Sequence, residues 1–170
     1  MTSNKPDIEN DPGTPAPMVP VLISLGANIA SPVGMPARTL KAALASLAGA
    51  GLEFIAVSPF YETEAWPDPT DPAFMNAVAA FRTNLQPLAL MTLLHEVETG
   101  FGRKRSVPNA PRALDLDLLD YAGRIAQGSL TLPHPRIAER RFVLEPLKEV
   151  APNWRHPVSG RGVDELLNSL

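Results

Sequence analysis

A run of alternating leucine and aspartate, LDLDL at residues 114–118, limits the fold of this chain more than any other stretch. Side chains alternate between the two faces of a β-strand, so the three leucines share one face and the two aspartates share the other. A strand face made of leucine needs a packed core against it. The run therefore predicts a strand with one buried face and one face that carries two neighbouring carboxylates.

Asp115 and Asp117 are close enough on such a strand to repel each other. Side chains two residues apart lie about 7 Å from each other, and at an effective dielectric constant of about 20 two ionised carboxylates at that separation repel by about 2 kcal/mol. A divalent cation removes this repulsion, and Mg²⁺ accepts carboxylate oxygens while it keeps water and phosphate ligands. The alternative left open by the pair itself is that both aspartates simply face solvent.

Hydrophobic periodicity and turn residues predict an α+β chain around this strand. We expect strands at 19–25, 52–63 and 73–85 and helices at 36–48 and 87–99, all before the LDLDL strand. The resulting order β-α-β-β-α-β is that of a ferredoxin-like core. Three appended elements are also expected: a short strand at 128–132 that adds a hairpin, and C-terminal helices at 138–150, interrupted near Pro146, and at 163–170.

Composition excludes several classes of function. The net charge of −3 over 170 residues gives no reason to expect nucleic acid or an anionic membrane as a partner. The absence of cysteine excludes disulfides, thiolate metal sites and cysteine nucleophiles. No apolar run approaches the ~18 residues of a membrane span, and the N-terminus lacks the apolar centre of a signal peptide, so we expect a cytoplasmic protein. Five of the 19 prolines fall in the first 20 residues, which predicts a disordered proline-rich tail at 1–18 and a single domain at 19–170.

Basic residues gather around the two aspartates. Of the 15 lysines and arginines, 8 lie between residues 101 and 141 in a chain that is acidic as a whole: Arg103, Lys104, Arg105, Arg112, Arg124, Arg136, Arg140 and Arg141. Carboxylates for a metal and guanidinium groups for phosphate are the combination that polyphosphate chemistry requires. The chain has neither a P-loop nor the glycine-rich loop of protein kinases, so both of those classes are excluded.

Six segments occur in a fixed order: SLGAN (24–28), SPFYETEAW (58–66), FMNAV (74–78), EVETGFGRKR (96–105), PRALDLDLL (111–119) and LPHPRIAERRFVLEPLKEVAP (132–152). Together they resemble the 6-hydroxymethyl-7,8-dihydropterin pyrophosphokinase family over residues ~21–157. The resemblance implies an ATP-dependent diphosphotransferase of tetrahydrofolate biosynthesis, which moves pyrophosphate from ATP to the hydroxymethyl group of the pterin and releases AMP. It also implies small-molecule substrates, two Mg²⁺ ions and a monomer.

Position by position, the resemblance also implies roles for individual residues. Asp115 and Asp117 correspond to the ligands of the two Mg²⁺ ions, and the catalytic positions are Arg103, Arg112 and Asp117. The ATP-binding positions are Glu98, Arg105, Leu118, Thr131, His134 and Arg140. We expect Glu98 to hold a neighbouring arginine rather than to contact substrate. The pterin-binding positions are Asn28, Thr63, Glu64, Trp66, Phe74, Asn76 and Phe142, the two phenylalanines stacking on the ring and Asn76 reading its amide edge.

The loop at 103–111 departs from the family pattern. It is about one residue shorter than usual, and Asn109 stands where a tryptophan commonly caps the substrates. Three other functions remain as alternatives: single-stranded RNA binding by sheet aromatics, another magnesium-dependent phosphoryl or glycosyl transferase that uses D-x-D, and an inactive relative retained for protein contacts. The RNA-binding alternative lacks the aromatic motif of that module and the basic charge that it needs.

Overall fold

The structure is a computed structural model, which describes residues 15–104 and 107–170. Its centre is a five-stranded antiparallel sheet in the order β2-β4-β1-β5, with β3 also paired to β4. The strands are β1 (Val19–Ala27), β2 (Glu53–Val57), β3 (Tyr61–Thr63), β4 (Phe74–Thr83) and β5 (Asp115–Tyr121). This strand order and the intervening helices make a ferredoxin-like core, which confirms the predicted α+β fold class.

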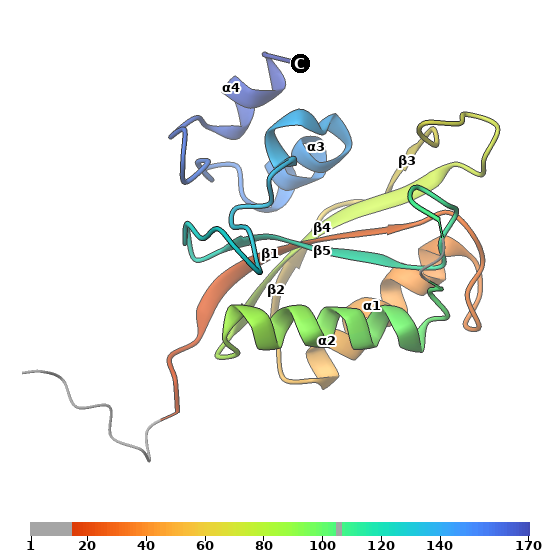
Figure 1. The fold of residues 1–170 in the computed structure, drawn as a ribbon, viewed down its shortest axis with the longest axis horizontal. Helices are drawn as coiled ribbons and strands as arrows, with labels where there is room; N and C mark the ends of the chain where they lie inside the picture. Colours follow the sequence, from red (N-terminus) through yellow and green to blue (C-terminus); the bar gives the residue numbers. More distant parts are fainter. Residues whose placement is uncertain (1–14, 105–106) are drawn as a thin grey trace, which may run out of the picture.

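Helices cover both faces of the sheet, so the molecule has three layers (Figure 1). On one face lie α1 (Pro36–Gly49) and α2 (Pro87–Gly100), and on the other α3 (Arg141–Val150) and α4 (Val163–Leu167). Both α1 and α2 begin at a proline, whose fixed φ suits the first helical turn and whose missing N–H is not needed there. A single turn of 3₁₀ helix, η1 (Ile137–Glu139), precedes α3.

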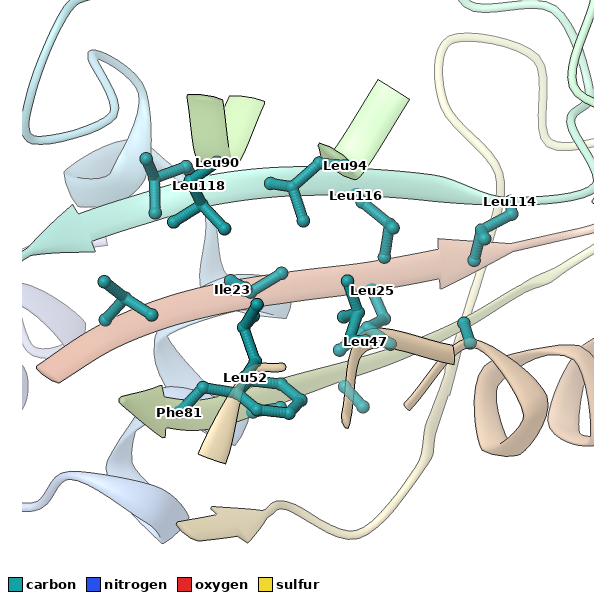
Figure 2. Packing of buried hydrophobic residues seen from close by; sticks show 14 of the residues in the cluster. Ile23, Leu25, Leu47, Leu52, Phe81, Leu90, Leu94, Leu114, Leu116 and Leu118 are labelled. Carbon is teal, nitrogen blue, oxygen red and sulfur yellow. The ribbon is translucent and has the colours of Figure 1, made fainter. Parts of the chain in front are cut away.

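The larger core lies between the sheet and the α1–α2 layer. Figure 2 shows the leucines of β5, Leu116 and Leu118, beside Leu90 and Leu94 of α2, and all four belong to one buried cluster. The leucine face of the LDLDL run is thus buried, as the alternation predicts. A second cluster on the opposite face joins the sheet to α3 and α4 through Leu22, Val78, Leu119, Val143, Leu144 and Leu166.

Three predicted elements differ in the structure. The strand expected at 52–63 is divided into β2 and β3, because Pro59 has no N–H and Ser58 pairs with Val78 partly through its hydroxyl oxygen. The strand expected at 128–132 does not form; an isolated bridge between Ala126 and Leu132 closes that segment. The helix expected at 138–150 is interrupted at Arg140 rather than near Pro146, which lies inside α3.

The structure describes only part of the N-terminal segment that the sequence predicts to be disordered. Of the tail expected at 1–18, residues 1–14 lie outside the described residues, and 15–18 carry no helix or strand. The carbonyl of Met18 accepts a hydrogen bond from Arg82 just before β1 begins. In the part of the chain that the structure describes, no helix is long and apolar enough to cross a membrane.

Candidate active site

A cavity of about 510 Å³ opens on the α3 face of the sheet. The polarity of that face changes along each strand. Leu22 and Val78 are packed against the α3 layer, but two positions further along the same face β1 carries Ser24 and β4 carries Asn76. On β5, Leu119 lies at the apolar end of the same face, and Asp117 and Asp115, two and four residues before it, lie at the polar end. The apolar end of the face holds α3, and the polar end is left as the floor of the cavity.

Small residues of β1 keep this floor open. Asp115 pairs across the sheet with Gly26, and Asp117 pairs with Ser24. A Cβ atom at Gly26 would lie 3.0 Å from the Oδ1 of Asn76, which is too close for an undisturbed side chain. Gly26 therefore leaves room for the Asn76 amide, and neither carboxylate has a bulky neighbour on β1.

Asp115 is neutralised by two arginines. Its Oδ1 accepts a hydrogen bond from Arg103 at 2.6 Å, and its Oδ2 accepts one from Arg112 at 3.1 Å. Arg103 is held from behind by Glu98, which is buried and whose Oε1 also accepts the backbone N–H of Leu116 at 2.8 Å. The C-terminal end of α2 is thus fastened to the start of β5, and one carboxylate of the pair is fully compensated.

Asp117 has no such compensation. Its Oδ2 lies 3.6 Å from Arg140 and 3.8 Å from the Nε2 of His134, both longer than a hydrogen bond. Burial raises the pKa of Asp117, and the negative charge of Asp115 raises it further. The ionised form of Asp117 is therefore unfavourable in this cavity, and a bound cation would stabilise it.

The two aspartates fit a divalent cation that brings other ligands with it. Carboxylate oxygens are the donors that Mg²⁺ takes in proteins, usually one or two of them together with water and phosphate. Within residues 15–104 and 107–170, no three His, Cys, Asp or Glu side chains converge to hold an ion by themselves. The residues present are thus suited to a metal that arrives with a phosphate ligand.

His134 presents an N–H to this site. Its backbone N–H donates to the carbonyl of Leu119, which fixes the residue beside β5, and its Nδ1 accepts the backbone N–H of Arg136 at 3.1 Å. Burial lowers the pKa of His134 despite the opposing attraction of Asp117. In the neutral ring the proton therefore lies on Nε2, the nitrogen that faces Asp117.

Two phenylalanines line the cavity, one from the sheet and one from the helix layer that covers it. Phe74 comes from β4 and Phe142 from α3, and an arginine lies over each ring: Arg112 at 5.8 Å and Arg140 at 5.6 Å from the ring centres. Asn76, two residues after Phe74 on β4, donates from its Nδ2 to the hydroxyl of Thr63 at 2.7 Å, which orients its amide. This half of the cavity suits a flat heterocycle with a polar edge.

Most of the residues predicted from the sequence meet in this one cavity. The lining includes Thr63, Glu64, Trp66, Phe74, Asn76, Arg103, Arg112, Asp115, Asp117, His134, Arg140 and Phe142. Arg105 lies outside the described residues.

Four predicted residues do not line the cavity. Leu118 is in the core beneath the sheet, because alternation along β5 turns it away from the aspartates. Thr131 is exposed, and Glu98 is buried behind Arg103. Asn28 is buried and joins two loops instead: its Nδ2 donates to the carbonyl of Pro72, and its Oδ1 accepts the backbone N–H of Arg112.

The structure also adds residues that the sequence reasoning did not select as site residues. Ser24 and Gly26 form the floor, and a signal for them was present in the SLGAN segment. Arg136 and Glu139 also line the cavity, from the start and the end of the η1 turn. The sequence indicates Arg136 only as one member of the basic cluster. Asn109 also lines the cavity, with φ at 61°, a left-handed conformation that asparagine tolerates.

Residues 22–152 match the family model described as 7,8-dihydro-6-hydroxymethylpterin-pyrophosphokinase (HPPK). The chain belongs to the HPPK family. The match covers all five strands except the first residues of β1, and it includes every described residue that lines the cavity. The family resemblance inferred from the six segments is thereby confirmed.

Individual members of the HPPK family agree with this assignment. The chain is 38% identical over 151 residues to the 2-amino-4-hydroxy-6-hydroxymethyldihydropteridine pyrophosphokinase of Synechocystis, covering 88% of this chain and 75% of the relative. It is 38% identical over 149 residues to the protein of the same name from Pseudomonas aeruginosa, covering 86% and 89%.

Other HPPK relatives are much longer than this chain. The folic acid synthesis protein fol1 of Pneumocystis carinii is 34% identical over 144 residues. The match covers 84% of this chain but 19% of that protein. One HPPK-DHPS structure of Plasmodium falciparum superposes with a TM-score of 0.71 at 12% identity, covering 95% of this chain and 45% of that one. At this identity the superposition shows the fold alone, and it agrees with the ferredoxin-like core described above.

Proposed function

We propose that this protein transfers pyrophosphate from ATP to the hydroxymethyl group of 6-hydroxymethyl-7,8-dihydropterin, a step of folate biosynthesis. The observation that carries the proposal is the single cavity in which the Asp115–Asp117 pair and four arginines lie beside two phenylalanines. The charged half suits a metal-bound triphosphate, and the aromatic half suits a pterin. Family membership supports the same reaction.

The reaction joins the hydroxymethyl oxygen of the pterin to the β-phosphorus of ATP. The bond from that phosphorus to the oxygen of the α-phosphate breaks, AMP leaves with both bonding electrons, and the hydroxyl loses its proton. Asp115 and Asp117 would hold two Mg²⁺ ions, which when bound supply charge stabilisation and orientation for the phosphates. Asp117 is also the candidate acceptor of the hydroxyl proton, since its pKa is raised by burial and by Asp115.

The arginines would stabilise charge on the phosphates. Arg103 and Arg112 are already aligned on the two oxygens of Asp115, so a metal taken up by Asp115 leaves their outer N–H groups free to turn to phosphate. The Nε2–H of His134 and the guanidinium of Arg140 face Asp117, where a phosphate oxygen that shares its metal would lie. These four groups are our proposed polyphosphate-binding set.

The pterin would lie between Phe74 and Phe142, with its amide edge on Asn76. The hydrogen bond from Asn76 to Thr63 uses one N–H of the amide and leaves its oxygen for the ring. Glu64 and Trp66 line the cavity next to this position, and Trp66 is mostly exposed. Residues of a single chain provide both the charged and the aromatic half of the cavity, and we propose that the monomer is the catalytic unit.

One assay separates the proposed reaction from its alternatives. The protein is incubated with ATP, Mg²⁺ and the reduced hydroxymethylpterin, and the nucleotide product is identified. We expect AMP together with the pterin diphosphate. ADP as the product would indicate an ordinary kinase, and the absence of any turnover with both substrates bound would indicate a binding protein; either result overturns the proposal.

The cation requirement provides an independent test. Addition of a chelator in excess over Mg²⁺ should abolish AMP formation, and restoring Mg²⁺ should recover it, because the two carboxylates cannot bind a triphosphate without a cation between them. Chelation should leave the fold intact, since apolar clusters on both faces of the sheet hold the layers together. Turnover that persists in the chelator would refute the metal assignment.

A further inference from the structure

Four arginines line the cavity, and Arg136 differs from the other three. The side chains of Arg103, Arg112 and Arg140 are 18%, 22% and 22% exposed, and each lies against Asp115 or Asp117. Arg136 is 54% exposed, and its Nε lies 3.7 Å from the Oε2 of Glu139, beyond hydrogen-bond distance. Among the four cavity arginines, Arg136 therefore loses the least interaction energy when its side chain turns to a new partner.

The backbone of Arg136 is nevertheless fixed. Its N–H donates to the Nδ1 of His134, and its carbonyl accepts the N–H of Glu139 across the η1 turn. Ile137, the next residue, is fully buried in the core beneath α3. The segment thus places an exposed guanidinium at a fixed backbone position of the cavity lining, together with the two groups that face Asp117.

Arg136 lies among other nitrogen-bearing side chains. It lines the same cavity as His134 and Arg140, and its backbone N–H donates to the ring of His134. Arg140 lies 3.6 Å from Asp117 and Arg136 lies 3.7 Å from Glu139, so two guanidinium groups line the cavity close to the imidazole of His134. Such crowding is unfavourable until a polyanion enters, and Glu139 is the acid that moderates it meanwhile.

We propose that Arg136 is a further triphosphate-binding residue and that Glu139 is a positioning residue that holds it at the rim until the nucleotide arrives. Binding exchanges the weak Arg136–Glu139 ion pair for a charge-assisted contact with a phosphate oxygen. The inference rests on the proposed function in that it takes a nucleoside triphosphate as the ligand of this cavity.

The decisive measurement is equilibrium binding of a non-hydrolysable ATP analogue with Mg²⁺. For Arg136→Gln we expect the Kd to rise about 5- to 10-fold at low salt, the lower end of what a lost charge-assisted hydrogen bond gives at a half-exposed site. The matched control is Arg141→Gln, which removes the same charge five residues later. Arg141 is equally exposed but is ion-paired with Glu145 and does not line the cavity. Its Kd should stay within twofold of the wild type.

Glu139→Gln tests the positioning role, because the proposal predicts the opposite sign. Freed from its partner, Arg136 should bind phosphate more readily, so the Kd should fall about 2- to 3-fold. In the double variant with Arg136→Gln this gain should disappear. In steady-state kinetics the KM for ATP should follow the Kd in each variant, while kcat changes little, a split that a merely structural role would not produce.

Three outcomes would overturn the inference: equal Kd values for the Arg136→Gln and Arg141→Gln proteins, a rise in Kd for Glu139→Gln, or a Glu139→Gln gain that persists without Arg136. The last of these would show simple repulsion between Glu139 and the nucleotide. Because these measurements use binding, they remain interpretable if the wild type forms no AMP, a result that would count against the proposed function instead.

Discussion

Asp115 and Asp117 lie two residues apart on one face of β5, yet neutralising each should change the stability of the protein in opposite directions. We expect Asp115→Asn to destabilise the ligand-free protein and Asp117→Asn to stabilise it, while both variants lose most of the pyrophosphate transfer. The reason is that Asp115 is paired with two arginines and Asp117 is not hydrogen-bonded to any cation in its surroundings.

The magnitudes follow from the geometry. Repulsion between the aspartates is about 2 kcal/mol at the ~7 Å spacing of a strand. Asp117 is one-third exposed and is attracted by Arg140 and His134, so we set the net gain from Asp117→Asn at about 1 kcal/mol. Asp115→Asn weakens two charge-assisted hydrogen bonds, and after relief of the same repulsion the loss should be about 1–2 kcal/mol. For a chain of this length 1 kcal/mol corresponds to about 2–4 °C in Tm.

The effect of Asp117→Asn should depend on pH. The pKa of Asp117 is raised by burial and by Asp115, so the folded state holds this proton more tightly than the unfolded state does. Stability from such a group is present below the ordinary carboxyl pKa of about 3.9 and is lost as the pH rises through the folded value. The variant should therefore match the wild type near pH 4 and exceed it at pH 7.

The assay is thermal unfolding of the wild type and both variants in chelator, between pH 4 and pH 7, with AMP formation measured separately. Mg²⁺ with an ATP analogue should raise the Tm of the wild type and of neither variant. A loss of stability in both variants at pH 7, or an Asp117→Asn advantage that is larger at pH 4 than at pH 7, would refute the reasoning.

Three further predictions concern residues around the cavity. Glu98→Ala should lower the free energy of unfolding by about 2–4 kcal/mol, because it removes one of the two carboxylates that hold Arg103 and the acceptor of the Leu116 N–H; urea unfolding measures this, and a loss below 1 kcal/mol would contradict it. Gly26→Ala should raise the KM for the pterin about tenfold and leave the KM for ATP unchanged, since the new Cβ displaces Asn76; equal changes in both constants would argue against it. Asn28→Ala removes two hydrogen bonds between loops and should lower the free energy of unfolding by about 2 kcal/mol in the same urea assay; an unchanged midpoint would disprove the bridging role.

Local pattern was enough to predict much of this protein. Alternation in the LDLDL run determined which face of β5 is buried, and proline with helical periodicity located the starts of α1 and α2 at their first residues. The clustering of arginines around the aspartates in the sequence indicates polyphosphate chemistry. These features depend only on residues that are close together in the chain, so they can be predicted from the sequence alone.

Long-range pairing decided the rest. Strand register set Ser24 beside Asp117 and Gly26 beside Asp115, and no local signal gives that register. Leu118 is in a functional motif but faces the core, and Asn28 matches a pocket position but joins two loops. The difference in charge compensation between the two aspartates also arises only in the folded state. Chemically identical side chains two residues apart are paired differently because separate segments of the chain bring arginines within hydrogen-bond distance of Asp115 but not of Asp117.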